Sequence, residues 1–519
     1  MGDISFLFLL RILTEKSEKV NFDGLNFWKG RRKEVMNSPK VKISAKPSQS
    51  YTIEIHKMLI LILGLIIMSA VYVILPQEYT ESARIMLAFL ALSVFYWTFE
   101  PVPIGLTALI LLVFMLVFGV VSTEVVYSGF SSPAIFLIIG GMMLARGVND
   151  TPLAERIAYI FLAKWGGTAK GLLASILVIP QIQSFFIPAA AVRTALLLPV
   201  ALMSLDTIGE RGKGNLTKMI LLGVAFGSTI SGTAIMTAAI GNILTVELLN
   251  EFLGIKITYL QWFYYTFPIW IALIPIAWYL LIKSFPLTEE EKNFPHVKEE
   301  IENKLSDLGK INSQEKRCLG ILLLIVALWF TEPWHGLHPS VPALIGVILM
   351  ALPGIGCTKW DHIIKIDFNT VLLMGVTLSL GYAFNKSGAA ALVGKSLSTE
   401  WMIDLLRSPV LAVITILVLT QILHLAVANV STAVVTLIPI FIGLASQAGA
   451  DAVLICLTAS LACLHGYILV VEATPNIIVH SSGKIQQKEF FIPGLKLTIW
   501  MSIITLITAV TWWNWLGLL

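Results

Sequence analysis

Long apolar stretches recur along the chain and are separated by short polar segments. The stretches at 59–75 and 501–510 contain no charged residue. A helix needs about 20 predominantly apolar residues to cross the hydrocarbon core of a membrane. The strands of a membrane barrel would instead alternate polar and apolar residues. Because the apolar runs are continuous, the pattern predicts an all-α polytopic membrane protein.

The apolar segments differ in length and continuity, and this predicts about 11 transmembrane helices, two re-entrant hairpins and two broken helices. The hairpins lie at about 171–206 and 409–446, where paired half-length segments are too short to cross the membrane separately. The broken helices lie at about 219–249 and 450–479, where small and polar residues interrupt the apolar sequence. The continuous spans lie at about 58–76, 82–98, 102–121, 131–148, 263–283, 318–331, 340–355, 368–386 and 493–517.

Charge predicts the orientation and narrows the class of protein. Only 13% of the residues are charged, against about 25% in a soluble domain. Basic residues gather in a tail at 1–57 and in a linker at 284–317, which we expect to be cytoplasmic in an inner-membrane protein whose N-terminus is inside. The net charge of +4 does not indicate a nucleic-acid partner, because basic residues flank membrane segments. The lipid bilayer is the expected surrounding.

Three pairs of motifs recur in the same order in the two halves of the chain. A W-x-x-E-P pattern ends at Pro101 and again at Pro333. Pro199 and Pro439 follow the two hairpins, and Asn242 and Asn476 follow the two breaks, so that all three pairs have nearly the same spacing. The charge pattern puts the two W-x-x-E-P motifs on opposite sides, so 58–283 and 318–519 are predicted to be inverted repeats. Glu100 and Glu332 are expected only to begin helices.

The polar residues of each repeat concentrate at the hairpin tip and at the break, where free backbone groups are expected. Pro475 removes a backbone donor, and Gly227, Gly232 and Gly241 weaken the other span. An unwound stretch offers carbonyl oxygens to a cation, and a half-helix that begins there presents free N–H groups to an anion. The sequence therefore predicts a site for an anion and a cation, in which each hydroxyl has the alternative of bonding its own backbone.

Two sets of candidate residues follow. The substrate-binding candidates are Ala189, Ala190, Arg193, Thr194, Thr233, Asn429, Ser431, Thr432, Thr474 and Pro475. The cation-binding candidates are Ser184, Ser228, Thr229, Gly232, Asn242, Ala428, Asn429, Glu472, Thr474 and Asn476. Na+ is the candidate coupling ion, and no other metal or cofactor is expected.

Arg193 and Glu472 are the charges expected within the membrane. A charge there costs at least about 2.5 kcal/mol, so it is seldom kept without a partner or a task. Arg193 is expected to bind a substrate carboxylate, with pairing to a backbone carbonyl as the alternative. Glu472 is expected to be a counter-charge or a proton or cation site, with structural balance of Arg193 as its alternative.

At these residues the chain resembles the divalent anion:sodium symporter family, including its citrate/succinate-type exchanger branch. Thr474-Pro475-Asn476 matches the family's second broken helix, and the stretch from Pro188 to Arg193 is similar to the exchanger branch. Where the family carries Ser-Asn-Thr motifs that bind sodium and substrate, this chain has Ala189-Ala190-Ala191 and Ala428-Asn429-Val430. The resemblance implies a homodimer in which a transport domain moves like an elevator against a scaffold.

These features predict a secondary active transporter of small di- or tricarboxylate anions, working by cation-coupled symport or by anion exchange. A transporter of sulfate or another inorganic oxyanion is the alternative within transport. A membrane-embedded enzyme is the rival class, but the chain contains neither Gly-x-Ser-x-Gly nor His-Glu-x-x-His. A channel is less favoured, because two inverted hairpin repeats that converge on one site are typical of carriers.

Overall fold

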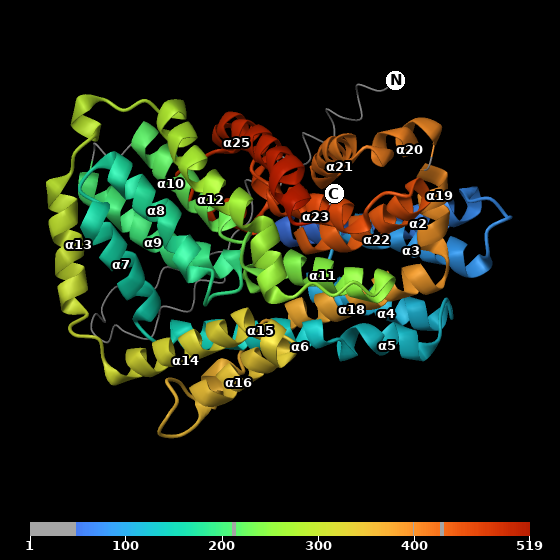
Figure 1. Ribbon diagram of the computed structural model, residues 1–519, viewed down its shortest axis with the longest axis horizontal. Coiled ribbons are helices and arrows are strands. Elements are labelled where there is room, and N and C mark those ends of the chain that lie inside the picture. The colour runs from blue at the N-terminus through green and yellow to red at the C-terminus, as the bar shows by residue number, and fades with distance from the viewer. Residues whose placement is uncertain (1–47, 210–213, 398, 426–429, 519) are drawn as a thin grey trace. The chain divides into compact units, whose positions relative to one another are not determined.

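The computed structural model describes residues 48–209, 214–397, 399–425 and 430–518 (Figure 1). The chain divides into two units, Met1–His56 and Lys57–Leu519. Most of the predicted tail at 1–57 lies outside the described residues. Within the described ranges every regular element is a helix, which confirms the predicted all-α membrane fold.

The first repeat contains α2 to α12. Its helices are α2 (Ser48–Ile74), α3 (Glu81–Phe99), α4 (Ile104–Val117), α5 (Thr123–Ser131), α6 (Pro133–Asn149), α7 (Leu153–Trp165), α8 (Ala169–Gln183), α9 (Ala190–Ile208), α10 (Asn215–Ile230), α11 (Ile240–Leu253) and α12 (Tyr259–Ser284). Helices α8 and α9 form the first hairpin. Helices α10 and α11 form the first broken helix, and a 3-10 turn at Met236–Ala238 lies in the break.

The second repeat follows the linker helix α13 (Pro295–Asp307). Its helices are α14 (Ser313–Phe330), α15 (Glu332–His335), α16 (Ser340–Ala351), α17 (Trp360–Ile363), α18 (Phe368–Lys386), α19 (Ala389–Leu397), α20 (Glu400–Arg407), α21 (Pro409–His424), α22 (Val430–Ala448), α23 (Ala452–Leu464), α24 (Thr474–His480) and α25 (Gln487–Thr508). Helices α21 and α22 form the second hairpin, and α23 and α24 form the second broken helix around a 3-10 turn at Val470–Glu472.

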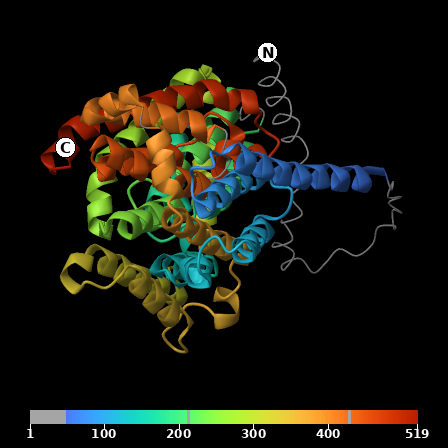
Figure 2. The ribbon, with the colours of Figure 1, turned by 90° about the vertical axis from the view of Figure 1, so that its right-hand side faces the viewer.

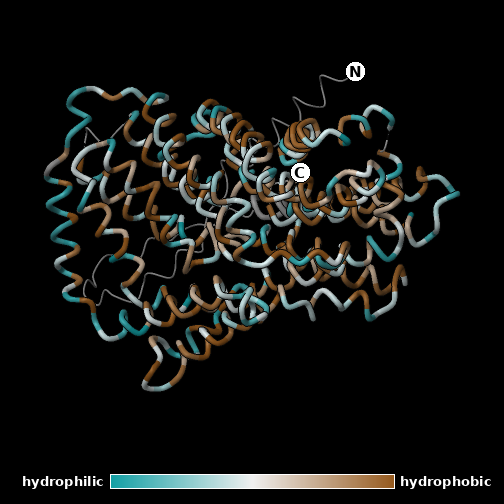
Figure 3. Tube along the Cα trace, viewed as in Figure 1, coloured by the Kyte–Doolittle hydropathy of each residue, from teal (hydrophilic) through white to brown (hydrophobic). Residues whose placement is uncertain are grey.

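Eight helices of the described residues are long and apolar enough to cross a membrane, and a ninth span arises if α20 and α21, bent by 119°, are counted as one. The eight include α9 and α22, so the second arms of the two hairpins are longer than the half-length segments expected from the sequence. Among the shorter apolar helices are α10 and α23, the first halves of the broken helices. The continuous apolar stretches appear along most of the helical trace in Figure 3. The chain is thus a multi-pass membrane protein in which a helix pair followed by a broken helix occurs once in each half.

The two repeats pack against each other along their later helices. Helix α12 contacts α25, α10 contacts α24, and α11 contacts both α22 and α23. On another side, α18 packs on α4 and α5, while α16 packs on α6 and α14. Figures 1 and 2 both place α14 and α16 on the side of the second unit opposite α25. The broken helices therefore meet each other, rather than each packing only within its own repeat.

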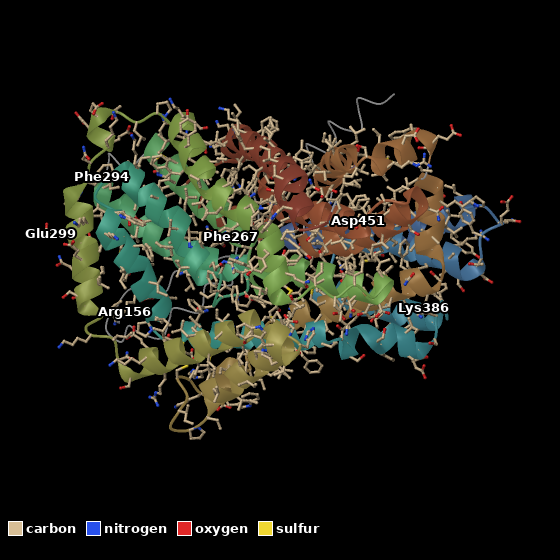
Figure 4. The ribbon with its side chains drawn as sticks, viewed as in Figure 1. Arg156, Phe267, Phe294, Glu299, Lys386 and Asp451 are labelled. Atoms are coloured by element: carbon tan, nitrogen blue, oxygen red, sulfur yellow. The ribbon has the colours of Figure 1, made fainter. Side chains whose placement is uncertain are left out.

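The charged linker carries a helix that docks on the first repeat. Helix α13 is largely hydrophilic (Figure 3), yet Val297 and Ile301 are buried and the helix contacts α7. Figure 4 shows Glu299 on its outer side and Arg156 near its end. Because Val297 and Ile301 are four residues apart, they share one face of the helix, and that face packs on the first repeat.

A candidate site where two broken helices meet

The two broken helices match each other residue by residue. In each broken helix the 3-10 turn ends at the same distance after the first half-helix: Ala238 follows Ile230, and Glu472 follows Leu464. Ala239 and Ala473, the next residues, share an extended backbone with φ and ψ of −143° and 135°, and of −139° and 138°. Neither α11 nor α24 has a side-chain cap on its first turn. The start of α11 therefore favours an anion, whereas in the seven-residue α24 Pro475 has no N–H and the N–H groups of Asn476 and Ile477 bond the carbonyl of Ala473.

An asparagine holds each break open. The side-chain NH2 of Asn242 donates to the carbonyls ten and seven residues upstream at 2.8 and 3.3 Å. Asn476 donates to carbonyls at the same two spacings, at 3.1 and 3.0 Å. The side-chain oxygen of each asparagine is buried and has no hydrogen-bond partner among the described residues. A buried carbonyl oxygen without a partner costs about 1–3 kcal/mol, so both oxygens are suited to coordinate a cation.

Arg193 ties the first hairpin to the first break. It lies in the first turn of α9 and is fully buried. Its Nε donates to Ser231 Oγ at 2.9 Å and its Nη2 to the carbonyl of Ala238 at 3.1 Å. Its Nη1 donates to the carbonyl of Ile187, just before the hairpin turn. The guanidinium is therefore held by backbone carbonyls, the alternative considered from the sequence, and it places a positive charge at the first break.

The charge of Arg193 is not neutralised by these contacts. In the described part of the chain its hydrogen-bond partners are two backbone carbonyls and one hydroxyl. Next to it, Ala189 and Ala190 at the start of α9 are partly exposed, and no side chain caps that helix end. A positive charge behind an uncapped helix N-terminus makes this hairpin tip attractive to an anion.

The second break carries an acid where the first carries an alanine. Glu472 ends its 3-10 turn at the position that corresponds to Ala238 in the first repeat. Its Oε2 accepts a hydrogen bond from the backbone N–H of Ile468 at 2.9 Å, while Oε1 is buried with no partner among the described residues. The two breaks thus differ in charge: a guanidinium binds the first and a carboxyl group belongs to the second.

Glu472 and His424 both pack against Gly466. A Cβ atom added to Gly466 would lie 2.6 Å from Glu472 Cβ and 3.0 Å from His424 Cε1. His424 ends α21 and is buried, and neither ring nitrogen has a partner within the described ranges. Glycine at this position therefore allows the second hairpin and the second break to approach each other closely.

The remaining candidates fall into three groups. The hydroxyls of Ser184, Thr194 and Thr229 donate to carbonyls of their own helices, as the structural alternative expects. Ser228 and Thr432 have buried hydroxyls without a partner in the described residues, and Ser431 is buried beside Thr432. Thr474 is exposed and Pro475 buried at the start of α24, whereas Ala428 and Asn429 lie outside the described residues.

Two contacts join the repeats directly at the breaks. Thr233 Oγ1 lies 3.0 Å from His465 Nε2, and Thr245 Oγ1 donates to Ser460 Oγ at 2.8 Å. His465 also bonds the carbonyl of Leu461 through Nδ1 at 2.6 Å. Ser231, Ala238 and His465 are the contacts that sequence reasoning missed as site residues. Their positions beside the glycine-rich and proline-rich interruptions were the available signal.

Comparisons with known proteins agree with a transporter. A family model described as the sodium:sulfate symporter transmembrane region matches residues 54–519. A protein of Cupriavidus necator named only as a membrane protein is 27% identical over 85% of this chain and 89% of its own. The sodium-dependent dicarboxylate transporter SdcS of Staphylococcus saprophyticus is 24% identical over 90% of this chain and 92% of its own.

Two further similarities are more distant or cover less of the chain. The sodium-dependent high-affinity dicarboxylate transporter 3 of Caenorhabditis elegans is 24% identical over 79% of this chain and 80% of its own. Among solved structures, the YdaH transporter of Alcanivorax borkumensis aligns with a TM-score of 0.47 at 13% identity, over 74% of this chain and 87% of that one.

Proposed function

Because the chain belongs to the divalent anion:sodium symporter family, and is therefore a transporter rather than an enzyme, we propose that it carries small di- or tricarboxylate anions across the inner membrane. The observation that carries this proposal is the pair of matched breaks, with Arg193 buried at one of them. The half-helices α9, α11 and α22 begin at the tips and at the first break and supply N–H groups for carboxylates. The printed names of the staphylococcal and nematode relatives support a dicarboxylate.

The proposed carboxylate contacts are the starts of α9 and α22, including Ala189, Ala190 and Ser431, and the side chain of Thr474. The partly exposed start of α9 and the exposed Thr474 support an approach by solute. Arg193 acts as a resident counter-charge behind the first tip, because its hydrogen bonds to carbonyls hold it in place. Its field then favours an anion without a direct bond.

Coupling is proposed to rest on the second break. At the first break the positive charge of Arg193 disfavours a second cation, although Asn242 Oδ1 has no partner among the described residues. Asn476 Oδ1 and Glu472 Oε1 are buried oxygens without described partners, the ligand type that a hard cation such as Na+ prefers. One Na+ bound at the second break would accompany the anion. A homodimer with elevator-type movement and a cytoplasmic N-terminus completes the proposal.

Uptake into proteoliposomes tests this function. Labelled succinate, malate, citrate and sulfate would each be offered with an inward sodium gradient, with a proton gradient, or with unlabelled anion inside. Saturable uptake of one or more carboxylates is the expected result. Uptake of sulfate alone would replace the proposed substrate class, and no uptake of any anion under any gradient would overturn the function.

A further inference from the structure

The second W-x-x-E-P motif makes a contact that its sequence role as a helix start does not require. Glu332 Oε2 accepts a hydrogen bond of 2.6 Å from the backbone N–H of Tyr259, the first residue of α12 in the other repeat. The ring of Trp329, from the same motif, stacks on Tyr259 with centroids 5.2 Å apart and planes 15° apart. The motif therefore bonds and stacks on the N-terminus of α12, a helix that packs beside the first break.

Tyr259 connects this contact to the first break. It is fully buried, and its hydroxyl lies 3.3 Å from Thr237 Oγ1 in the 3-10 turn. A carboxylate at a helix N-terminus is favoured by the helix dipole and by the free N–H groups. A continuous series of contacts thus runs from Glu332 through Tyr259 to the turn that ends at Ala238, the partner of Arg193.

The equivalent contact of the other repeat is not made. Glu100, the glutamate of the first motif, is exposed, and its carboxylate has no hydrogen bond or ion pair within the described ranges. It caps α3 with φ of 41°, which makes it the one described non-glycine residue in the left-handed region. The buried Trp97 of this motif has no partner for its indole N–H among the described residues, whereas Trp329 donates to the carbonyl of Pro339.

A docking point equivalent to the start of α12 nevertheless exists. Capping boxes begin both α12, with Thr258 and Gln261, and α25, with Gln486 and Glu489. The first residue of α25, Gln487, accepts a hydrogen bond from the backbone of Val470 at 2.7 Å, in the 3-10 turn of its own break. In the first repeat, the hydroxyl of Tyr259, the first residue of α12, likewise contacts the 3-10 turn of the first break. The start of α25 therefore resembles the start of α12, but among the described residues it has no contact with a W-x-x-E-P motif.

We infer that the two W-x-x-E-P motifs alternate in bonding the start of α12 and the start of α25. In the arrangement seen here Glu332 holds the start of α12, and in the opposite-facing arrangement Glu100 holds the start of α25 while Glu332 releases Tyr259. The reason is that alternating access moves one repeat against the other, so a contact between the repeats that is made at one motif in this arrangement can be made at the matching motif in the opposite one. A contact made by one repeat alone marks which of the two arrangements is present. This inference rests on the proposed alternating access and makes both glutamates positioning residues.

Cysteine crosslinking in proteoliposomes tests the exchange. One variant carries Glu332→Cys with Thr258→Cys, and the other carries Glu100→Cys with Gln486→Cys, so that each pair joins a motif to a helix start. The four native cysteines are buried and can remain. Each pair is expected to form a reducible crosslink that stops transport. A pair of Glu100→Cys with Thr258→Cys, which joins a motif to the wrong helix, serves as the control and should not react.

A third substitution measures the exchange without removing the reacting pair. In the Glu100→Cys, Gln486→Cys variant, Glu332→Ala should raise the initial rate of crosslinking about tenfold, the ratio that corresponds to loss of one charge-assisted hydrogen bond. Glu124→Ala, which removes an exposed acid at the start of α5, should leave that rate unchanged.

The outcomes separate this inference from the transport proposal. If the wild-type protein transports but the Glu100→Cys, Gln486→Cys variant forms no crosslink under any gradient, the inference is overturned and the function stays intact. Crosslinks at both pairs in a protein that carries none of the four anions would support the exchange and refute the proposed substrates. An unchanged rate in the Glu332→Ala variant would also count against the exchange.

Discussion

Arg193 and Ala238 are joined by a hydrogen bond of 3.1 Å from the guanidinium to a backbone carbonyl, across 45 residues of sequence. The residue that corresponds to Ala238 in the second repeat is Glu472. The two breaks have the same backbone, but a guanidinium bonds the first and a carboxyl group belongs to the second. This asymmetry is the basis for assigning a resident charge to the first break and a mobile cation to the second.

Replacement of Arg193 tests the resident charge. Arg193→Ala should reduce carboxylate uptake at least about tenfold, because an attraction of one charge-assisted interaction is lost. Arg193→Lys keeps the charge and should retain more of the uptake than Arg193→Ala. Both rates would be normalised to folded protein measured by thermal unfolding. Equal uptake by the alanine variant and the wild type would show that this charge plays no part.

Alanine variants of the two asparagines are expected to share a loss of stability but to differ in the sodium dependence of uptake. Asn242→Ala and Asn476→Ala remove the side-chain donor from the carbonyls of Gly232 and Gly466, which are then left without a partner among the described residues, at about 1–3 kcal/mol each, so both variants should lower the thermal stability. Only Asn476→Ala should also weaken the dependence of uptake on sodium, because the proposed cation lies at its break. Equal changes of sodium dependence in both variants would contradict the assignment.

Gly466 and Gly232 are equivalent glycines with different surroundings. A Cβ on Gly466 would lie 2.6 Å from Glu472 Cβ, a contact that the backbone has to shift to relieve, whereas a Cβ on Gly232 would meet its nearest atoms at 3.3 Å. Gly466→Ala is therefore expected to abolish uptake, and Gly232→Ala to retain most of it. Uptake by matched amounts of purified protein provides the comparison, and tolerance of alanine at Gly466 would refute the close approach.

The buried ion pair between Arg156 and Glu315 predicts a large loss of stability. Arg156 donates Nε to Oε1 at 2.6 Å and Nη2 to Oε2 at 3.1 Å, and it also bonds the carbonyls of Leu308 and Gly309. Arg156→Ala leaves a buried carboxylate unpaired and should cost about 3–5 kcal/mol.

The exposed pair of Lys292 and Glu289 provides a control for that prediction. Both side chains reach solvent, so Lys292→Ala should cost at most about 1 kcal/mol. Thermal unfolding in detergent compares the two variants with the wild type. Equal effects of the two substitutions would mean that the pair at Arg156 does not hold α7 to the start of α14.

Local signals in the sequence were sufficient for the fold class and for the breaks. Gly232, Pro475 and the two asparagines interrupt apolar runs, and such interruptions act within a few residues of themselves. The partners of Arg193 and Glu332 could not be predicted, because Ser231, Ala238 and Tyr259 lie 38 to 73 residues away and are brought close only by tertiary packing. The docking of α13 was missed because its charges outnumber the few apolar residues on its buried face.

The dependence of carboxylate uptake on sodium, at constant ionic strength, tests the central claim most directly. Because the charge of Arg193 lies at the first break and one sodium ion is proposed at the second, the initial rate should saturate with sodium with a Hill coefficient of about 1. Glu472→Gln should raise the sodium concentration needed for half-maximal uptake. Cooperative activation by two or more sodium ions would contradict the account. So would an initial rate of carboxylate uptake that changes neither with the sodium concentration nor with the Glu472→Gln substitution.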